Sequence, residues 1–281
     1  MKALKDQVIL VTGATDGLGK RVASDLSAFG ATVLLHGRSR EKGEATLQEI
    51  RDSTGNQKLI YYNADFSSLD AVRRLSEKIK SEHERLDVLI NNAGIGPGSR
   101  QARREKSVDG HELRFAVNYL ALFYLTHQLL PLLRQSSSAR IVNVASVGQE
   151  AIDFENVMLE DGYDGLRAYR QSKLAQVMFT LDLAGELEGS GITVNSLHPA
   201  SLMSTRMVLE TDYFGGPMTT VQEGADAVEY LALSPELDGV TGEYFNGKRR
   251  ARANAQVYDK EARRRLRVLS EQLTKIKGSD N

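Results

Sequence analysis

The stretch Val11-Thr12-Gly13-Ala14-Thr15-Asp16-Gly17-Leu18-Gly19 decides the fold of this chain. A short apolar run, Gln7 to Thr12, leads directly into three glycines spaced Gly-x-x-x-Gly-x-Gly, and a stretch of helical pattern follows. Glycine permits a tight turn and a close approach of the backbone to a phosphate, while the first turn of a helix offers free N–H groups and a positive dipole. The stretch therefore predicts a strand, a phosphate-binding turn and a helix.

Similar apolar runs and helical patterns alternate over most of the chain. The expected strands are Gln7 to Thr12, Ala31 to His36, Lys58 to Asn63, Asp87 to Asn91, Arg140 to Ala145 and Ile192 to His198. The expected helices are Gly17 to Phe29, Arg40 to Ser53, Ser68 to Glu84, Val108 to Leu133 and Tyr163 to Leu187. Most strand runs lack a period of two, as expected for strands buried on both faces. The pattern predicts an α/β fold of Rossmann type, a doubly wound parallel sheet with helices on both faces.

We expect one domain over residues 1–281, because no repeat, low-complexity tract or linker divides the chain. Within it, a segment over about 200–222 carries many apolar side chains and predicts a mobile lid. Leucines among basic residues predict a terminal helix over about 255–276, docked by its apolar face.

Composition restricts the class of function. The chain has 36 Lys plus Arg against 37 Asp plus Glu, a net charge of −1, which gives no general attraction to nucleic acid or to an anionic membrane. The absence of cysteine excludes disulfides, thiolate metal sites and cysteine nucleophiles, and is compatible with a cytoplasmic location. We expect no signal peptide and no membrane span, since no stretch looks close to the roughly 20 apolar residues a span needs.

Tyr169 and Lys173 predict an acid/base group. Residues four apart on a helix share a face, so the lysine ammonium can lie beside the phenol. A neighbouring positive charge lowers the phenol pKa from its ordinary value of about 10, and a tyrosine so tuned can exchange a proton near neutral pH. The alternative is an aromatic packing residue beside a solvated charge.

The second expected strand ends in His36-Gly37-Arg38-Ser39-Arg40, without the acid that would hold a ribose 2′-hydroxyl. Arg38 can offer a bidentate fork to a 2′-phosphate, which favours NADP(H), with Ser39 or Arg40 as a helper. Alternatively, Arg38 only caps a surface loop. Asp65 has two open interpretations, a contact to the adenine amine or a helix-capping turn before Ser67 and Ser68.

Six motifs occur in order: the glycine turn, Asn91-Asn92-Ala93-Gly94, Asn118, Ser146, Tyr169-x-x-x-Lys173 and His198-Pro199. On these motifs the chain resembles the short-chain dehydrogenase/reductase family over about residues 6–250. The runs Gly37 to Glu44, Tyr169 to Gln176 and Gly242 to Phe245 make it most similar to the branch of retinol dehydrogenases and related carbonyl reductases. One departure is Pro199-Ala200, where the family usually has Pro-Gly.

The resemblance implies the division of labour in the site. Ser146 would hydrogen-bond the substrate oxygen, Tyr169 would move the proton, and Lys173 would lower the phenol pKa and hold the nicotinamide ribose. Asn118 would place a water in the proton relay. The residues expected to bind NADP(H) are Gly13, Thr15, Asp16, Gly17, Leu18, Gly19, Arg38, Ser39, Asp65, Phe66, Asn92, Ala93, Gly94, Tyr169, Lys173, Pro199 and Thr205. Ser201 and Ser204 compete with Thr205 for the carboxamide, and no metal is expected.

Two segments are expected to cover the substrate, Val147 to Gly165 and the stretch after Pro199. Their apolar side chains predict a lipophilic small-molecule alcohol, ketone or aldehyde, unless they pack a helix or a neighbouring subunit instead. Two alternatives to an alcohol/carbonyl oxidoreductase remain, a C=N or C=C reductase and a non-catalytic NADP-binding sensor. The family also implies a homo-oligomer, dimer or tetramer, often through the long helices carrying Asn118 and Tyr169, although the terminal helix could cover that surface.

Overall fold

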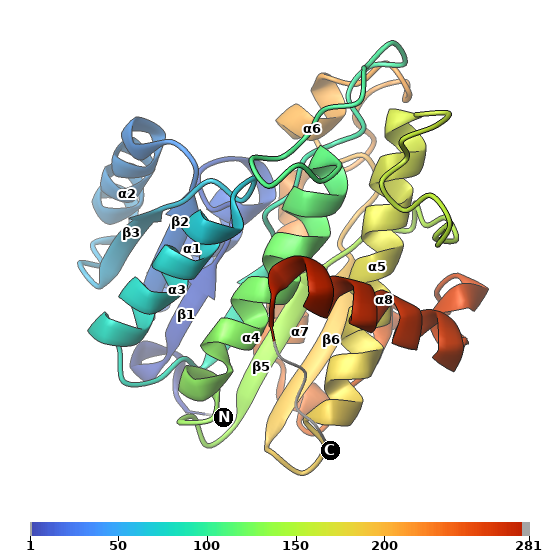
Figure 1. Ribbon diagram of the computed structural model, residues 1–281. Helices are drawn as coiled ribbons and strands as arrows, with labels where there is room; N and C mark the ends of the chain where they lie inside the picture. Colours follow the sequence, from blue (N-terminus) through green and yellow to red (C-terminus); the bar gives the residue numbers. More distant parts are fainter. Residues whose placement is uncertain (1, 277–281) are drawn as a thin grey trace.

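The computed structural model describes residues 2–276 and contains one eight-stranded sheet with the order β3-β2-β1-β4-β5-β6-β7-β8 (Figure 1). The strands are β1 (Val8–Val11), β2 (Thr32–Gly37), β3 (Leu59–Asn63), β4 (Val88–Asn91), β5 (Ala139–Val144), β6 (Ile192–His198), β7 (Tyr244–Asn246) and β8 (Arg249–Arg250). All neighbouring pairs are parallel except β7 with β8. The predicted doubly wound sheet is confirmed, with two short strands added that the sequence pattern did not predict.

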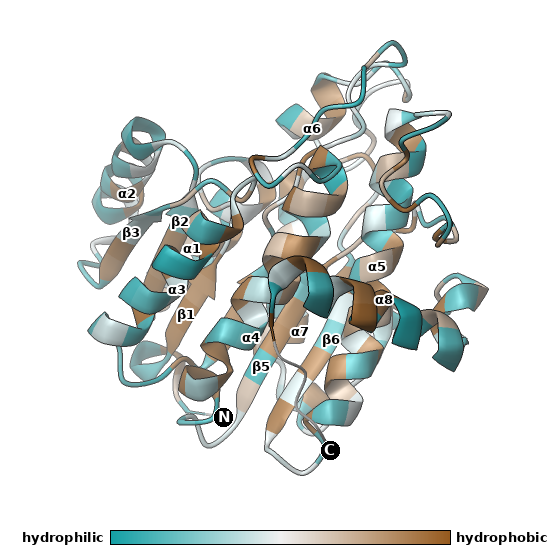
Figure 2. Cartoon of the chain, in the orientation of Figure 1, coloured by the Kyte–Doolittle hydropathy of each residue, from teal (hydrophilic) through white to brown (hydrophobic). Residues whose placement is uncertain are grey.

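Helices cover both faces of the sheet. One face carries α3 (Leu69–Glu82), α4 (Ala121–Leu133), α5 (Gly165–Glu186) and α8 (Lys260–Thr274), which share one buried apolar cluster. The other face carries α1 (Gly17–Ala28), α2 (Arg40–Thr54) and α7 (Val221–Leu233) over a second cluster. Figure 2 shows β1 in brown, β5 and β6 in brown with white and teal bands, and many outward helix faces in teal, as expected when most apolar surface is buried between layers.

The strand order reverses between β1 and β4, and this reversal positions the site. Loops that leave the carboxyl ends of these two strands run in opposite directions, so a crevice opens between them. The glycine turn follows β1 and the Asn92 loop follows β4. Most of the predicted site residues belong to loops at this edge.

The helix expected over Val108 to Leu133 begins later. A π-helical stretch, Phe115–Leu120, runs into α4, while Lys106 and Glu112 pair in an extended bridge. The turn between them contains Gly110 with φ of 86°, a conformation that favours glycine. Asp109-Gly110 is therefore a turn rather than helix.

Helix α7 was not among the helices predicted from the sequence. A Cβ at Gly224 would collide with the Met203 sulfur, so this glycine is required by packing and does not break the helix. The Thr220 side chain and the Glu223 side chain cap each other's backbone N–H groups at the helix start. This capping box is the sequence pattern that could have predicted the start of α7.

One helical stretch is long and apolar enough to be a candidate membrane span, contrary to the expectation from sequence. Phe115–Leu133 has 19 residues and a mean hydropathy of 1.2, and 72% of it is buried inside the fold. Such burial is typical of a core helix, which passes the same test of length and composition.

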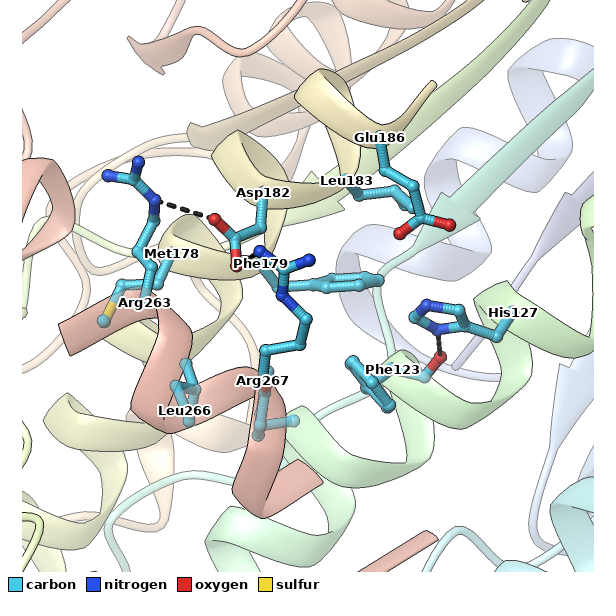
Figure 3. A pocket seen from close by; sticks show the side chains of 11 residues that line it. Phe123, His127, Met178, Phe179, Asp182, Leu183, Glu186, Arg263, Leu266 and Arg267 are labelled. Atoms are coloured by element: carbon cyan, nitrogen blue, oxygen red, sulfur yellow. Dashed lines mark hydrogen bonds and ion pairs between the residues drawn. The ribbon is translucent and has the colours of Figure 1, made fainter. Parts of the chain in front are cut away.

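Helix α8 lies across α4 and α5 (Figure 1). Arg263 Nε and Arg267 Nη2 lie 2.8 Å and 3.3 Å from the Asp182 carboxylate on α5, and Figure 3 shows this carboxylate between the two arginine side chains. The Tyr119 and Ser270 hydroxyls are hydrogen-bonded at 2.7 Å. The helix thus covers the surface through which we expected subunits to meet. The homo-oligomer stays a prediction, and any contact through α4 and α5 would have to include α8.

Candidate active site

The carboxyl edge of the sheet brings Ser146, Tyr169 and Lys173 together. Ser146 follows β5, and the other two lie on α5, whose first residue is fixed by a cap. The Asp164 carboxylate accepts a hydrogen bond from the Arg167 N–H at 2.7 Å. Because the cap sets where α5 begins, Tyr169 falls in its second turn.

The Ser146 hydroxyl lies beside the Tyr169 phenol. The Gly148 N–H donates to Ser146 Oγ at 3.0 Å, and a Cβ at Gly148 would lie 3.9 Å from the Tyr169 ring. The Tyr244 hydroxyl, from β7, donates to the Ser146 main-chain carbonyl at 3.0 Å. Tyr244 is a positioning residue that sequence reasoning missed, since nothing in the pattern predicted the strand that carries it.

Lys173 is buried beneath this pair, with its Nζ 5.8 Å from the centre of the Tyr169 ring. Nζ donates to the Val144 carbonyl at 2.9 Å and to Gln176 Oε1 at 3.2 Å. Burial lowers the pKa of Lys173 to about 7.

The predicted lowering of the Tyr169 pKa by Lys173 is wrong for this geometry. Burial raises the pKa of Tyr169, and the opposing influence is the adjacent Ser146 hydroxyl. The physical reason is that the lysine is turned toward two uncharged oxygens, so removal of the phenol from water outweighs the effect of the ammonium.

Asn118 lies in the π-helical stretch and is fully buried. Its Oδ1 accepts from the Ile95 N–H at 2.8 Å, and its Nδ2 donates to the Ile95 carbonyl at 3.1 Å and to Ser172 Oγ at 3.0 Å. Its main-chain carbonyl accepts from Gln176 Nε2 at 2.6 Å. The side-chain amide is thus held by protein partners, while the main-chain carbonyl keeps a second lone pair, and the role of Asn118 in placing a relay water stays a prediction.

The glycine turn packs against the end of β4. A Cβ at Gly13, which has φ of 65°, would lie 2.8 Å from the Ala93 Cα, and a Cβ at Gly19 would collide with the Gly13 carbonyl and the Asn92 amide. Asn92 Nδ2 donates to the Thr12 and Gly13 carbonyls at 2.9 Å and 3.2 Å. These contacts explain why the turn tolerates no side chain at either glycine.

The remaining predicted residues of the turn leave its backbone accessible to a diphosphate. Asp16 caps α1 by accepting from the Gly17 N–H at 2.7 Å, Thr15 is half-buried, and Leu18 is buried in the core. Free N–H groups of the first helical turn and the close-packed glycines fit a dinucleotide diphosphate.

His36 connects this turn to the end of β3, and sequence reasoning missed it. Nδ1 lies 3.4 Å from the Gly13 nitrogen, Nε2 lies 3.1 Å from the Ala64 carbonyl, and the ring stacks on Phe66 at 4.1 Å between centroids. Burial lowers the pKa of His36 to about 4, which keeps Nδ1 able to accept the Gly13 N–H. A histidine at the end of a buried strand was the only signal.

The adenosine end contains Arg38, Ser39 and Asp65. Arg38 is exposed and forms no salt bridge with any other residue of the described range 2–276, whereas Arg40 Nε pairs with Glu44 at 2.9 Å. Ser39 caps α2. Asp65 Oδ1 accepts from the Ser67 N–H at 2.9 Å, which favours the turn interpretation, while its contact to adenine stays a prediction.

Beyond β6, Pro199 begins the segment that approaches the glycine turn. A Cβ at Gly17 would lie 3.1 Å from the Thr205 methyl group, so Thr205 lies over the turn. Ser201 Oγ is instead 3.0 Å from His198 Nε2, and Ser204 is exposed. Of the three competing side chains, Thr205 is the one placed beside the predicted cofactor turn.

Arg114 holds the loop after β4 on the substrate side and was also missed. Its guanidinium donates to the carbonyls of Gly96 at 3.0 Å and Pro97 at 2.8 Å and to the Tyr163 hydroxyl at 2.6 Å. The only hint in the sequence was that Arg114 directly precedes the apolar run of a predicted helix.

The covering segment Val147 to Gly165 is only partly a substrate wall. Its apolar residues Ile152 and Leu159 are buried in the fold, so the packing interpretation holds for them. Two of its acidic residues, Glu150 and Asp153, pair with Arg167 at 3.2 Å and 3.3 Å. Residues 2–276 contain no group of three His, Asp or Glu arranged to hold a metal ion.

A doubly wound sheet with a glycine turn after β1 and a Ser-Tyr-Lys group at the same edge defines a dinucleotide-dependent oxidoreductase. The family model for short chain dehydrogenases matches residues 7–213, and the chain belongs to this family. It resembles the family's retinol dehydrogenase branch. Retinol dehydrogenase 13 of Mus musculus is 37% identical over 275 residues, spanning 92% of this chain and 81% of that protein. Retinol dehydrogenase 11 of Homo sapiens is 37% identical over 272 residues, spanning 94% and 84%.

Two solved structures of dehydrogenases or reductases are similar to this chain. A short chain dehydrogenase from Escherichia coli in complex with NADPH has a TM-score of 0.72 and 28% identity, covering 88% of this chain and 98% of that one. Salutaridine reductase from Papaver somniferum has a TM-score of 0.68 and 25% identity, covering 86% and 99%.

Proposed function

We propose that the chain is an NADP(H)-dependent oxidoreductase that interconverts a lipophilic alcohol with its ketone or aldehyde. The observation that carries the proposal is that the Ser146 hydroxyl and the Tyr169 phenol lie side by side, with Lys173 one helical turn further on. The proposal is also supported by the similar proteins, which are named as retinol dehydrogenases, and by a structural relative that holds NADPH.

The residues divide the chemistry as follows. A nicotinamide dinucleotide, when bound, supplies the hydride donor or acceptor. Ser146 donates a hydrogen bond to the substrate oxygen, and Tyr169 gives that oxygen a proton during reduction or takes one during oxidation. Two N–H groups of the Lys173 ammonium donate to protein carbonyl oxygens. The third N–H remains for the cofactor ribose or the Tyr169 phenol.

The choice of NADP(H) rests on Arg38. Its guanidinium is exposed and unpaired among residues 2–276, and the β2 end offers no carboxylate for a ribose hydroxyl. Titration of the purified protein with NADPH and NADH tests this assignment. Arg38→Glu should weaken NADPH binding by about 10-fold or more and leave NADH nearly unchanged. Arg40→Glu is the matched control, since Arg40 is already paired with Glu44, and equal losses for both nucleotides in Arg38→Glu would contradict the assignment.

The lipophilic substrate class rests on the segment 201–220, in which Leu209, Phe214 and Met218 are exposed. Exposed apolar side chains fit an apolar ligand here, because the same segment carries Thr205, which lies beside the glycine turn. Loss of reduced-cofactor absorbance with ketones and aldehydes of increasing apolar size tests the reaction. Turnover that rises with apolar size supports the proposal. Tight NADPH binding without turnover across the panel would contradict it and favour a C=N or C=C reductase or a sensor.

We also propose a cytoplasmic location. The absence of cysteine and the near-zero net charge are compatible with it. Recovery of the native protein in the membrane pellet after cell lysis and centrifugation would contradict this proposal.

A further inference from the structure

Gln176 bridges two groups of the catalytic region. It is fully buried on α5, three residues after Lys173. Its Oε1 accepts from Lys173 Nζ at 3.2 Å, and its Nε2 donates to the main-chain carbonyl of Asn118 at 2.6 Å. The orientation of the amide is fixed by its partners, because an ammonium only donates and a carbonyl only accepts.

Uncharged oxygens hold the lysine. Burial alone accounts for the lowered pKa of Lys173, and no carboxylate among residues 2–276 counteracts it. The titratable groups facing Lys173 are Tyr169 on its own helix and His198 at the end of β6. The pKa of His198 is lowered to about 4, so this imidazole is uncharged near neutral pH. The Gln176 and Val144 oxygens are therefore the groups that stabilise the charged form.

A chain of buried hydrogen bonds fixes Gln176 to the sheet. Thr180 Oγ1 donates to the Gln176 carbonyl at 2.9 Å and accepts from Asn143 Nδ2 at 2.9 Å. Asn143 Oδ1 in turn accepts from Asn91 Nδ2 at 2.9 Å. The turn of α5 that carries Gln176 is thus tied to β5 and β4, so its amide has little freedom to move.

We propose that Gln176 is a positioning residue for the acid/base group: its amide joins the Lys173 ammonium to the Asn118 main-chain carbonyl and so sets the direction in which the ammonium points. The inference rests on the proposed function to the extent that Lys173 serves Tyr169. A carboxamide is a poor acid and a poor base near neutral pH, so this bridge transmits no proton.

The test measures the titration of Lys173 directly. The full chain is labelled with 13C at lysine Cε, and the Lys173 signal is assigned by its loss in Lys173→Arg. In Gln176→Met, which keeps the volume but removes both polar contacts, the pKa of Lys173 should fall by about 1 unit. In Gln176→Glu, which still offers an oxygen to the ammonium, it should stay at or above the wild-type value.

Gln171→Met is the matched control. Gln171 is a second buried glutamine of α5, but its amide donates to the Ala151 carbonyl at 3.1 Å and does not contact Lys173. The pKa of Lys173 should be unchanged in this variant. If Gln176→Met does not fold, Gln176→Glu alone decides, since a pKa below the wild-type value would overturn the proposal.

The outcomes separate this inference from the proposed function, because the titration needs no substrate. An equal Lys173 pKa in wild type and Gln176→Met, within about 0.3 unit, overturns the role of Gln176 even if carbonyls are reduced. A Lys173 pKa that falls in Gln176→Met, in a protein that reduces no carbonyl, supports the role of Gln176 and contradicts the proposed function.

Discussion

The catalytic turn of α5 and the segment 201–220 border the same site but are built differently. Lys173 and Gln176 are buried and their side chains are held by protein hydrogen bonds. The segment 201–220 has one helix, Arg206–Leu209, and touches the rest of the site through surface contacts such as Thr211 Oγ1 to the Gly98 carbonyl at 2.9 Å. Its Met218 side chain is 76% exposed.

This difference separates chemistry from recognition. A proton-transfer group must be held within a fraction of an ångström, which buried hydrogen bonds achieve, whereas a pocket for apolar substrates needs only adaptable surface. The same type of substitution should therefore have unequal effects in the two regions.

The largest difference is expected between two tyrosines. Tyr169→Phe removes the acid/base hydroxyl and should lower turnover by about 10²–10⁴-fold with NADPH affinity retained. Tyr213→Phe removes a hydroxyl in the segment 201–220 that donates to Asp164 at 3.4 Å, and turnover should stay within about 2-fold. Steady-state kinetics on both variants measures this. Equal losses would show that Tyr169 has no special chemical role.

A second difference is expected between two glycines. A Cβ at Gly19 collides with the glycine turn, whereas a Cβ at Gly215 meets nothing within 4 Å. Gly19→Ala should weaken NADPH binding by about 10²-fold, because the turn must move. Gly215→Ala should leave binding unchanged. Fluorescence titration with NADPH compares the two, and tight binding by Gly19→Ala would mean that the turn is not the diphosphate site.

Burial of Lys173 should lower the free energy of unfolding by an amount that depends on pH. The pKa of Lys173 is about 7 in the folded chain and about 10.4 when unfolded. The penalty of burying the charge is complete below pH 7. Between pH 7 and 10.4 the unfolded chain binds more protons, so the stability of the wild type rises with pH.

Lys173→Met removes this penalty. Its melting temperature should exceed that of the wild type by several degrees at pH 6, and the gap should shrink by pH 10. Lys248→Met, at an exposed lysine, should show no such trend. A gap for Lys173→Met that is constant with pH would contradict the assignment.

The sequence predicted the parts of the fold and site that depend on local pattern. Gly13, Gly17 and Gly19 and the strand runs specify the turn and the sheet through short-range sterics and burial. By contrast, α7 was not predicted, and its Gly224 is required by a contact with Met203, which lies outside the helix. Tyr244 and β7 were missed for the same reason, since pairing with β6 decides them.

Side-chain roles were harder to predict than positions. The i, i+4 spacing of Tyr169 and Lys173 brings them close but does not determine where the ammonium points. Its direction depends on Gln176 and the Val144 carbonyl, which come from packing of α5 against the sheet. Spacing alone could not show that burial would dominate the pKa of Tyr169.

The smallest effect is expected at Met218, in the exposed part of the segment 201–220. Met218→Gln should change the free energy of unfolding by less than about 0.5 kcal/mol, because the side chain is 76% exposed. It should raise KM for apolar ketones about 3- to 10-fold and leave kcat unchanged, since the contact helps bind substrate equally in the ground and transition states. Met178→Gln, at a fully buried methionine of α5, should instead lower stability by about 2 kcal/mol or more. A fall in kcat at constant KM for Met218→Gln would show that this segment takes part in the chemistry, and the division between the two regions would fail.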